Sequence, residues 1–155
     1  MKIKIISFGK PKYPFLSAGI LEYENRLKNL VSFSNESLKE VPVKNGNYEE
    51  SLKKEEIEIL KKHKKSVSNY LLVENSQFYS SVEFSKSLEN DMLKRGPEIH
   101  FFIGSPYGFS NKIKEMIPNH LSISKMTFTH DMARFLLVEQ IYRAITIQKN
   151  IPYHN

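Results

Sequence analysis

The chain has 155 residues, with 23 Lys and Arg side chains against 17 Asp and Glu, and it contains no cysteine. The length predicts a single domain over residues 1–155, and the lack of cysteine excludes disulfide bonds, thiol nucleophiles and thiolate metal ligands. Apolar runs of about four residues are too short for a membrane-spanning helix, and the N-terminus lacks a signal-peptide pattern. We therefore expect a cytoplasmic protein with no membrane partner.

The net charge of +6 is concentrated in the first half, where residues 1–70 hold 14 basic and 9 acidic side chains. A positive field of this kind favours a polyanion such as nucleic acid. Much of the surplus, however, lies in Lys61, Lys62, Lys64 and Lys65, and such a run also suits the solvated C-terminal end of a helix. Charge alone leaves both interpretations open.

Strands and helices are predicted to alternate along the chain. Apolar alternation and short apolar runs predict strands over residues 2–8, 31–41, 69–74, 98–103 and 120–126. Helical spacing and capping signals predict helices over residues 15–30, 48–65, 81–94, 110–117 and 131–150. Five such alternations indicate an α/β sandwich with a mainly parallel sheet. Ligands bind outside the carboxyl ends of such strands, so the loops after residues 74, 103 and 126 are candidate ligand loops.

The last predicted helix contains four consecutive apolar residues at positions 135–138. They cover its whole circumference, so a single buried face cannot account for them. We expect one face to pack on the sheet and the other on a second copy of the chain, across a two-fold axis. The alternative is a helix that is merely central to its own domain.

Few short motifs point to chemistry. Residues 103–109 (IGSPYGF) form a glycine-bearing loop that could approach a ligand closely or be only a tight turn, and they match neither dinucleotide nor P-loop fingerprints. The histidines lack metal-site spacing, so we expect no metal, and no GxSxG elbow is present. Glu139 and Arg143 can pair along the last helix, and Arg134 is free to contact an anion, although solvation is the default for all three.

The C-terminal third carries a specific pattern. Residues 123–154 contain S-x-M-T-F-x-H-x-x-x-R, then L-x-E-Q-x-Y-R-A, and finally Y-H. The residues concerned are Ser124, Met126, Thr127, Phe128, His130, Arg134, Leu137, Glu139, Gln140, Tyr142, Arg143, Ala144, Tyr153 and His154. This segment closely resembles the end of the RlmH family of bacterial rRNA methyltransferases, which belong to the SPOUT superfamily. The N-terminal strand, the length and the glycine loop extend the resemblance over the whole chain.

The resemblance implies a homodimer of α/β domains, each with a C-terminal trefoil knot that binds S-adenosylmethionine (AdoMet). Periodicity alone would not reveal a knot. Carried over residue by residue, the AdoMet site falls on Leu72, Gly104, Ile123, Ser124, Lys125, Met126, Thr127 and Phe128. The chain departs from the family pattern in two places, with Gly104-Ser105 where the family has Gly-Gly and Ser76-Gln77 where it has Gly-Lys.

The resemblance also implies an activity, namely methylation of N3 of a pseudouridine in a hairpin loop of 23S rRNA on the assembled ribosome. We hypothesise that Tyr153 and His154 fold over the cofactor and supply the base or position the uracil ring. Arg134 and Arg143 are candidates for holding base carbonyls or phosphates. Two alternatives stay open, a non-catalytic RNA- or ribosome-binding module and an enzyme that methylates a small molecule.

Overall fold

The computed structural model describes residues 1–154 and builds one five-stranded sheet from them, in the order β2-β1-β4-β3-β5. The strands are β1 (Lys2–Phe8), β2 (Ser32–Leu38), β3 (Ser68–Gln77), β4 (Glu98–Ile103) and β5 (Asn119–Leu121). Every neighbouring pair runs parallel. The predicted α/β architecture with a mainly parallel sheet is confirmed. Asn155, the last residue of the predicted domain, lies outside the described residues.

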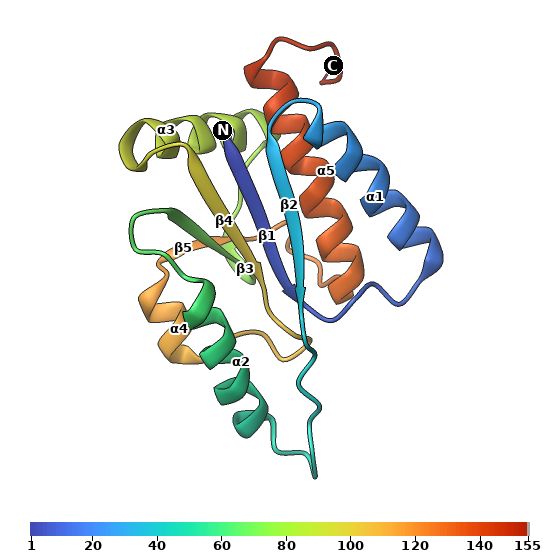
Figure 1. The fold of residues 1–155 in the computed structure, drawn as a ribbon, viewed down its shortest axis with the longest axis vertical. Helices are drawn as coiled ribbons and strands as arrows, with labels where there is room; N and C mark the ends of the chain where they lie inside the picture. The colour runs from blue at the N-terminus through green and yellow to red at the C-terminus, as the bar shows by residue number, and fades with distance from the viewer. Residues whose placement is uncertain (155) are drawn as a thin grey trace.

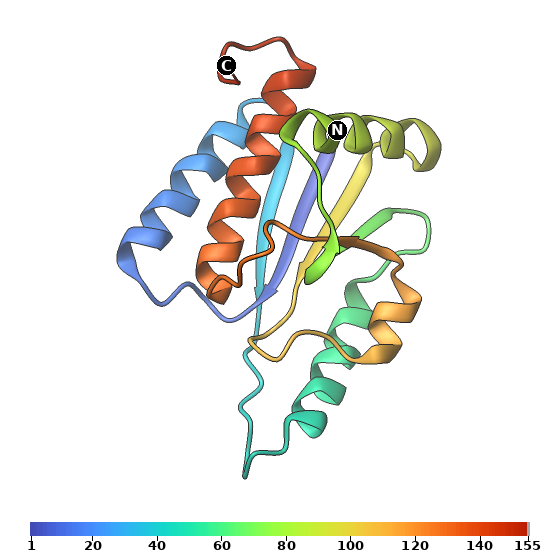
Figure 2. The ribbon, with the colours of Figure 1, turned by 180° about the vertical axis from the view of Figure 1, so that it is seen from behind.

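Helices cover both faces of this sheet (Figures 1 and 2). The helices are α1 (Pro14–Lys28), α2 (Tyr48–Lys62), α3 (Ser81–Arg95), α4 (Asn111–Met116) and α5 (His130–Gln148). One core cluster joins α1, α3 and α5 to one face, and a second cluster joins α2 and α4 to the other. Within residues 1–154, no helix combines the length and apolar character needed to cross a bilayer.

The sequence of β4 shows why both faces are covered. Ile99, Phe101 and Ile103 belong to the first core cluster, whereas Phe102 belongs to the second. Successive strand residues point to opposite faces, so apolar residues at the consecutive positions 101–103 require a hydrophobic layer on each side. The helices between the strands supply those layers.

One predicted strand was wrong in its extent, because β5 ends at Leu121 and residues 122–126 leave the sheet. The cause is Ser122, whose hydroxyl donates to the carbonyl of Val73 and accepts from the amide of Ser76, both at 2.7 Å. The side chain thereby binds backbone groups that a continuing strand would have paired. The other boundaries differ less, with β2 ending at Leu38, α2 at Lys62 and α5 at Gln148.

The last helix lies between α1 and α3 against the sheet (Figure 2). Its residues Leu137, Val138, Ile141 and Ala144 are fully buried within the chain. Gly19 permits the close approach of α1, since a Cβ there would lie 2.8 Å from the Phe135 ring. Much of the apolar run is therefore covered by the chain itself. Four apolar residues of this helix are only half-buried, namely Met132, Phe135, Leu136 and Tyr142, and of these Phe135 and Tyr142 pack against the core.

Candidate functional site

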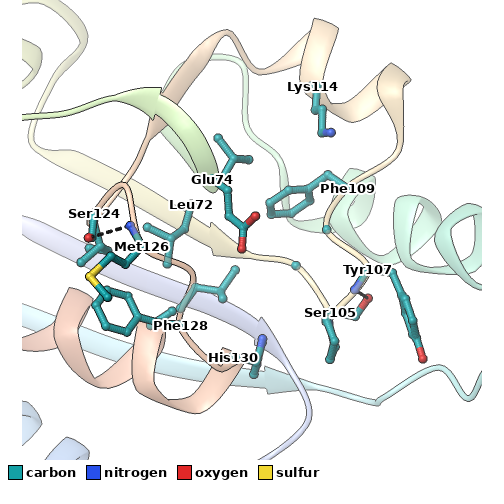
Figure 3. Close-up of a pocket in the computed structure, with 17 residues that line it drawn as sticks. Leu72, Glu74, Ser105, Tyr107, Phe109, Lys114, Ser124, Met126, Phe128 and His130 are labelled. Carbon is teal, nitrogen blue, oxygen red and sulfur yellow. Dashed lines mark hydrogen bonds between the residues drawn. The ribbon is translucent and has the colours of Figure 1, made fainter.

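The carboxyl ends of β3, β4 and β5 meet around a cavity of about 370 Å³, which we call the main cavity (Figure 3). Its walls come from the end of β3, from the glycine loop after β4 and from the segment that follows β5. The residues that line it include Leu72, Glu74, Gly104, Ser105, Tyr107, Phe109, Lys114, Ile123, Ser124, Met126, Phe128 and His130. The loop after residue 103 and the segment around residue 126 thus lie around one cavity, as predicted. The predicted loop after residue 74 was wrong, because β3 continues to Gln77, and it is the strand residues Leu72 to Glu74 that line the cavity.

Most of the residues carried over as the cofactor site line this cavity. Leu72, Gly104, Ile123, Ser124, Met126 and Phe128 contribute to its walls. Lys125 and Thr127 belong to the same segment and are exposed, but they are not among the lining residues. Sequence reasoning missed Glu74 and Lys114 as wall residues. The position of Glu74 directly after the apolar run of β3 was the available signal for it.

The glycine loop is both a tight turn and a cavity wall, so the two interpretations of residues 103–109 are compatible. A Cβ at Gly104 would lie only 2.5 Å from the carbonyl oxygen of Gly108, which excludes any side chain there. Gly108 has a φ of 78°, and its amide donates to the carbonyl of Ser105 at 2.9 Å. The loop is thereby fixed with bare backbone beside the cavity.

The segment after β5 provides apolar side chains on a locally fixed backbone. The amide of Met126 donates to the hydroxyl of Ser124 at 3.0 Å, which closes a turn. The Met126 side chain is 75% exposed at the cavity rim, and the Phe128 ring lies beside it (Figure 3). Opposite this segment, Glu74 places a carboxylate on the wall.

The main cavity fits AdoMet by size and by chemistry. Its volume lies in the range of small-molecule sites, which are mostly apolar with a few polar groups. Leu72, Ile123 and Met126 offer flat apolar surface to an adenine ring, and the crowded backbone of Gly104 can approach a ligand without a side chain between. The carboxylate of Glu74 suits a cation such as a sulfonium or an ammonium group.

His130 is the first residue of α5 and lines the cavity from below. Burial lowers the pKa of its imidazole, and the positive charge of Arg134 lowers the pKa further. The negative charge of Asp131 and hydrogen bonds with backbone groups of Phe8 and Gly104 act in the opposite direction and raise it, but the net shift is downward. The ring is therefore neutral at physiological pH. Its Nε2 atom is buried and has no hydrogen-bond partner among the described residues, so it is not exposed to a ligand in the cavity.

Arg134 is not solvated as expected but is only 3% exposed. Its guanidinium donates to the carbonyl of Gly9 at 3.3 Å, to Asn35 Oδ1 at 2.8 Å and to Ser37 Oγ at 3.1 Å. These partners lie 97 to 125 residues away in sequence, on or after two strands. Arg134 thus fixes the turn after β1 from within the protein.

The C-terminal tail contacts α5 and α1 through Tyr153 and lies at the end of the sheet opposite to the carboxyl ends of its strands (Figure 1). The Tyr153 hydroxyl donates to Glu139 Oε1 at 2.9 Å and lies 2.9 Å from the hydroxyl of Tyr23. Glu139 follows His130 by nine residues, which corresponds to about 13 Å along a helix. None of residues 149–154 lines the main cavity.

Arg143 holds the tail in this place. It pairs with Glu139 at 2.8 Å, as the spacing predicted, and its guanidinium lies 4.6 Å from the centre of the Tyr153 ring. Its Nη1 atom is 3.4 Å from Nδ1 of the exposed His154. The sequence-predicted residues therefore form two groups, one around the main cavity and one around the tail. No metal-binding group of three His, Asp or Glu side chains occurs within residues 1–154.

A parallel sheet with a ligand cavity at the carboxyl ends of its strands is typical of α/β enzymes that bind cofactors. Over residues 1–154, the chain matches the family model described as "Predicted SPOUT methyltransferase". The chain belongs to the SPOUT methyltransferase family.

Among individual proteins, the chain is similar to several named "Ribosomal RNA large subunit methyltransferase H". The protein of that name from Dictyoglomus thermophilum is 43% identical, over 99% of both chains. The one from Porphyromonas gingivalis is 39% identical, over 100% of this chain and 99% of its own length. A third, from Trichlorobacter lovleyi, is 36% identical over the full length of both chains. The resemblance drawn from the C-terminal motif is confirmed at the level of the family.

Proposed function

We propose that this protein is a cytoplasmic rRNA methyltransferase that transfers a methyl group from AdoMet to N3 of a pseudouridine in a 23S rRNA hairpin loop, on the assembled ribosome. The SPOUT family match and the names of the relatives support this proposal. The single observation that carries it is the main cavity, in which residues of β3, the glycine loop and the segment after β5 meet. Residues 1–155 would act as one domain with a C-terminal trefoil knot, in which the Ser122 contacts with Val73 and Ser76 hold the last segment beside β3.

The wall residues would divide the work of holding the cofactor. Leu72, Ile123, Met126 and Phe128 would enclose the adenine ring, while the backbone of Gly104 and Ser124 would meet its polar edge. Lys125 and Thr127 lie outside the wall in the same segment and would take part only if that segment closes on the cofactor. When bound, AdoMet supplies a methyl group on a sulfonium, and its transfer leaves a neutral thioether. The carboxylate of Glu74 would favour a cationic ligand over a neutral one.

Formation of the bond between N3 and the methyl carbon releases the N3 proton, which needs a base. His154 is exposed and its imidazole can accept a proton, so it suits this role. Tyr153 would position the uracil ring beside it. Arg143, whose side chain is 25% exposed, would hold a base carbonyl or a flanking phosphate. Arg134 is buried and would act indirectly, by fixing the turn at Gly9.

These two groups of residues can act together only if the tail of one chain reaches the main cavity of another. We therefore propose that the active form is a homodimer, built on the half-buried apolar residues of α5 and on exposed Phe15 of α1. Symmetric pairing of two copies is the commonest arrangement for such surfaces.

Two measurements test the proposed function. In a thermal-shift assay, AdoMet should raise the melting temperature of the protein, because a ligand that binds only the folded state stabilises that state. Transfer of a tritiated methyl group should then occur to ribosomes and not to naked 23S rRNA. Binding to ribosomes without any AdoMet effect would instead indicate a non-catalytic module. AdoMet binding without transfer to ribosomes would indicate a small-molecule acceptor.

A further inference from the structure

Helices α2 and α4 cover only part of the sheet face on their side. The core cluster beneath them contains Ile6, Leu38 and Phe102, which lie toward the carboxyl ends of their strands. Nearer the amino ends of β1, β2 and β4, no helix of residues 1–154 lies in front of the sheet (Figure 1). Parallel sheets normally have both faces covered, so this region is an unusual exposed part of the fold. We call it the open sheet face, and its residues are Lys2, Lys4, Ser32, Ser34, Glu36 and Glu98, with Lys62 and Lys64 beside them.

The strand register places polar residues of this face in rows across the sheet. In the first row, Lys2 lies between Ser32 and Glu98. In the second row, Lys4 lies beside Ser34. Residues two apart on a strand share a face, so both rows point to the side that α2 covers further along the strands. The rows therefore offer a polar surface and not the apolar face that a covering helix would need.

Two carboxylates each hold a pair of lysine ammonium groups on this face, in the trios Lys4–Glu36–Lys62 and Lys2–Glu98–Lys64. The N–O distances are 2.5 and 2.6 Å around Glu36, and both are 3.4 Å at Glu98. The Nε2 atom of His100 lies 2.7 Å from Glu98, but burial lowers the pKa of this histidine, so the ring is neutral and adds no charge. Each trio thus keeps one net positive charge. An ammonium group has three N–H donors, so a lysine that is bonded to a carboxylate can still donate to a second anion.

The lysine run after α2 contributes to this surface. From the sequence, the run at residues 61–65 fitted either a polyanion contact or a solvated helix end. Lys61 pairs with Glu58 of its own helix, whereas Lys62 and Lys64 reach across to the strands. Lys65 follows them and is exposed. The run is therefore divided, and its second part adds positive charge to the open sheet face.

We propose that the open sheet face is a docking surface for the phosphate backbone of rRNA. An ordered group of lysines with surplus positive charge is complementary to a polyanion, and phosphate contacts position a nucleic acid without reading its sequence. The hydroxyls of Ser32 and Ser34 are exposed and can donate to phosphate oxygens as well. This inference rests on the proposed function, which makes rRNA the partner.

The position of this surface suits RNA that flanks the reacting base. The open sheet face lies at the amino ends of the strands, whereas the main cavity lies at their carboxyl ends. The C-terminal tail lies at the same end as the open sheet face (Figure 1). In the proposed dimer, the tail of one chain reaches the main cavity of the other, so the open sheet face would flank the shared site.

The direct test is binding of the full-length protein to ribosomes and to naked 23S rRNA over a series of salt concentrations. The double variant Lys62→Gln, Lys64→Gln should bind both about tenfold more weakly at 0.1 M salt, and the slope of log affinity against log salt should fall by about 1.4 to 1.8. Glu36→Gln should bind more tightly, by about twofold or more, because it removes the anion between two lysines. A folding defect cannot produce tighter binding. The matched control is Lys86→Gln, Lys94→Gln, which removes two exposed lysines from α3 on the other side of the sheet.

Three results would overturn the docking surface. The first is an equal slope in the double variant and the control. The second is weaker binding by Glu36→Gln. The third is a loss of affinity for ribosomes without any loss for naked rRNA, which would make the partner a ribosomal protein.

Methyl transfer separates this inference from the proposed function. Neither Lys62 nor Lys64 lines the main cavity, so the double variant should raise KM for ribosomes about tenfold and leave kcat and AdoMet affinity unchanged. An active wild type with the same KM as the double variant overturns the docking surface alone. An inactive wild type whose binding to ribosomes still depends on these lysines overturns the proposed function alone.

Discussion

The hydroxyl oxygens of Tyr23 and Tyr153 lie 2.9 Å apart and join two residues that are 130 positions apart in the chain. Because Tyr153 donates its own proton to Glu139, Tyr23 must be the donor in this pair. Tyr142 contacts both rings, with centroid distances of 5.7 Å to Tyr23 and 4.8 Å to Tyr153. The tail is therefore fixed from α1 as well as from α5, and Tyr23 is a positioning residue that the sequence did not reveal.

Removing the Tyr23 hydroxyl should reduce methyl transfer without affecting cofactor binding. Tyr23→Phe deletes one hydrogen bond of about 1 kcal/mol, which corresponds to about a fivefold lower kcat. The ring contacts with Tyr142 remain, so the fold should be unaffected. Single-turnover transfer to ribosomes and AdoMet titration would measure the two effects. Tyr79→Phe is the matched control, and an unchanged rate in Tyr23→Phe would show that this bond does not position the tail.

The double variant Tyr153→Phe, His154→Ala tests the tail itself. Neither residue lines the main cavity of its own chain, and in the proposed dimer both would act on the acceptor base, so the AdoMet dissociation constant should change less than about twofold, which is below 0.5 kcal/mol. Turnover on ribosomes should be abolished if the tail supplies the base. Persistent turnover would show that the tail is not catalytic and would direct attention to His130.

Gly104→Ala should disrupt the glycine loop. The added Cβ would lie 2.5 Å from the carbonyl oxygen of Gly108, which is backbone and cannot rotate away. We expect AdoMet affinity to fall at least about tenfold, or 1.4 kcal/mol, as the cavity wall shifts. Isothermal titration calorimetry would measure it. Gly46→Ala is the control, because Gly46 has open space around its Cβ position and does not line the main cavity. Equal affinities in the two variants would exclude a role for the loop.

The sequence predicted the sheet and the loop cluster because both depend on local patterns. Apolar runs such as residues 98–103 identify strands directly, and a parallel sheet necessarily brings its carboxyl ends together. The error at residues 122–126 arose because Ser122 bonds Val73, a residue 49 positions away, which periodicity cannot report. Other contacts that shape the candidate site, such as the bond between Ser76 and Ser122, likewise join residues far apart in the sequence.

Arg134 illustrates the same limit. Its position in the helix sequence predicts a solvated cation. In the folded chain Arg134 is buried, because the tertiary structure places Asn35, Ser37 and the Gly9 carbonyl around its guanidinium. A second cavity, of about 180 Å³, was likewise missed, since it joins the turn after β1 to the start of α5. The family resemblance supplied the cofactor residues, but it did not place the tail relative to the cavity.

Arg134→Met should therefore act mainly on stability. It removes hydrogen bonds to Gly9, Asn35 and Ser37 and leaves buried acceptors without donors, at a cost of about 2–4 kcal/mol in the free energy of unfolding. Urea denaturation would measure the loss. Arg134→Lys keeps the charge but not the planar fork and should lose a similar amount. A variant of full stability without turnover would instead make Arg134 a catalytic residue.

The last prediction concerns Glu55 of α2, which is 2% exposed. Neither of its carboxylate oxygens has a hydrogen-bond partner among the described residues. Burial raises the pKa of Glu55 to about 7, and the charge of Glu40 adds to the rise, although nearby Ser105 opposes it. The carboxyl is therefore largely protonated in the folded protein at slightly acidic pH, directly behind the glycine loop.

A carboxyl whose pKa is higher in the folded state binds more protons there than in the unfolded chain between pH 4.5 and 7. Its contribution to stability is therefore lost as the pH rises through this window. Glu55→Gln cannot ionise, so relative to the wild type it should gain about 3 kcal/mol in unfolding free energy between pH 4.5 and pH 8. Urea denaturation of both proteins at these two pH values measures the gain, and the background from other titrating groups cancels in the difference. Glu58→Gln, on the exposed side of the same helix, is the matched control and should show no comparable gain. A difference between Glu55→Gln and the wild type that is the same at both pH values would mean that Glu55 is already ionised in the folded protein.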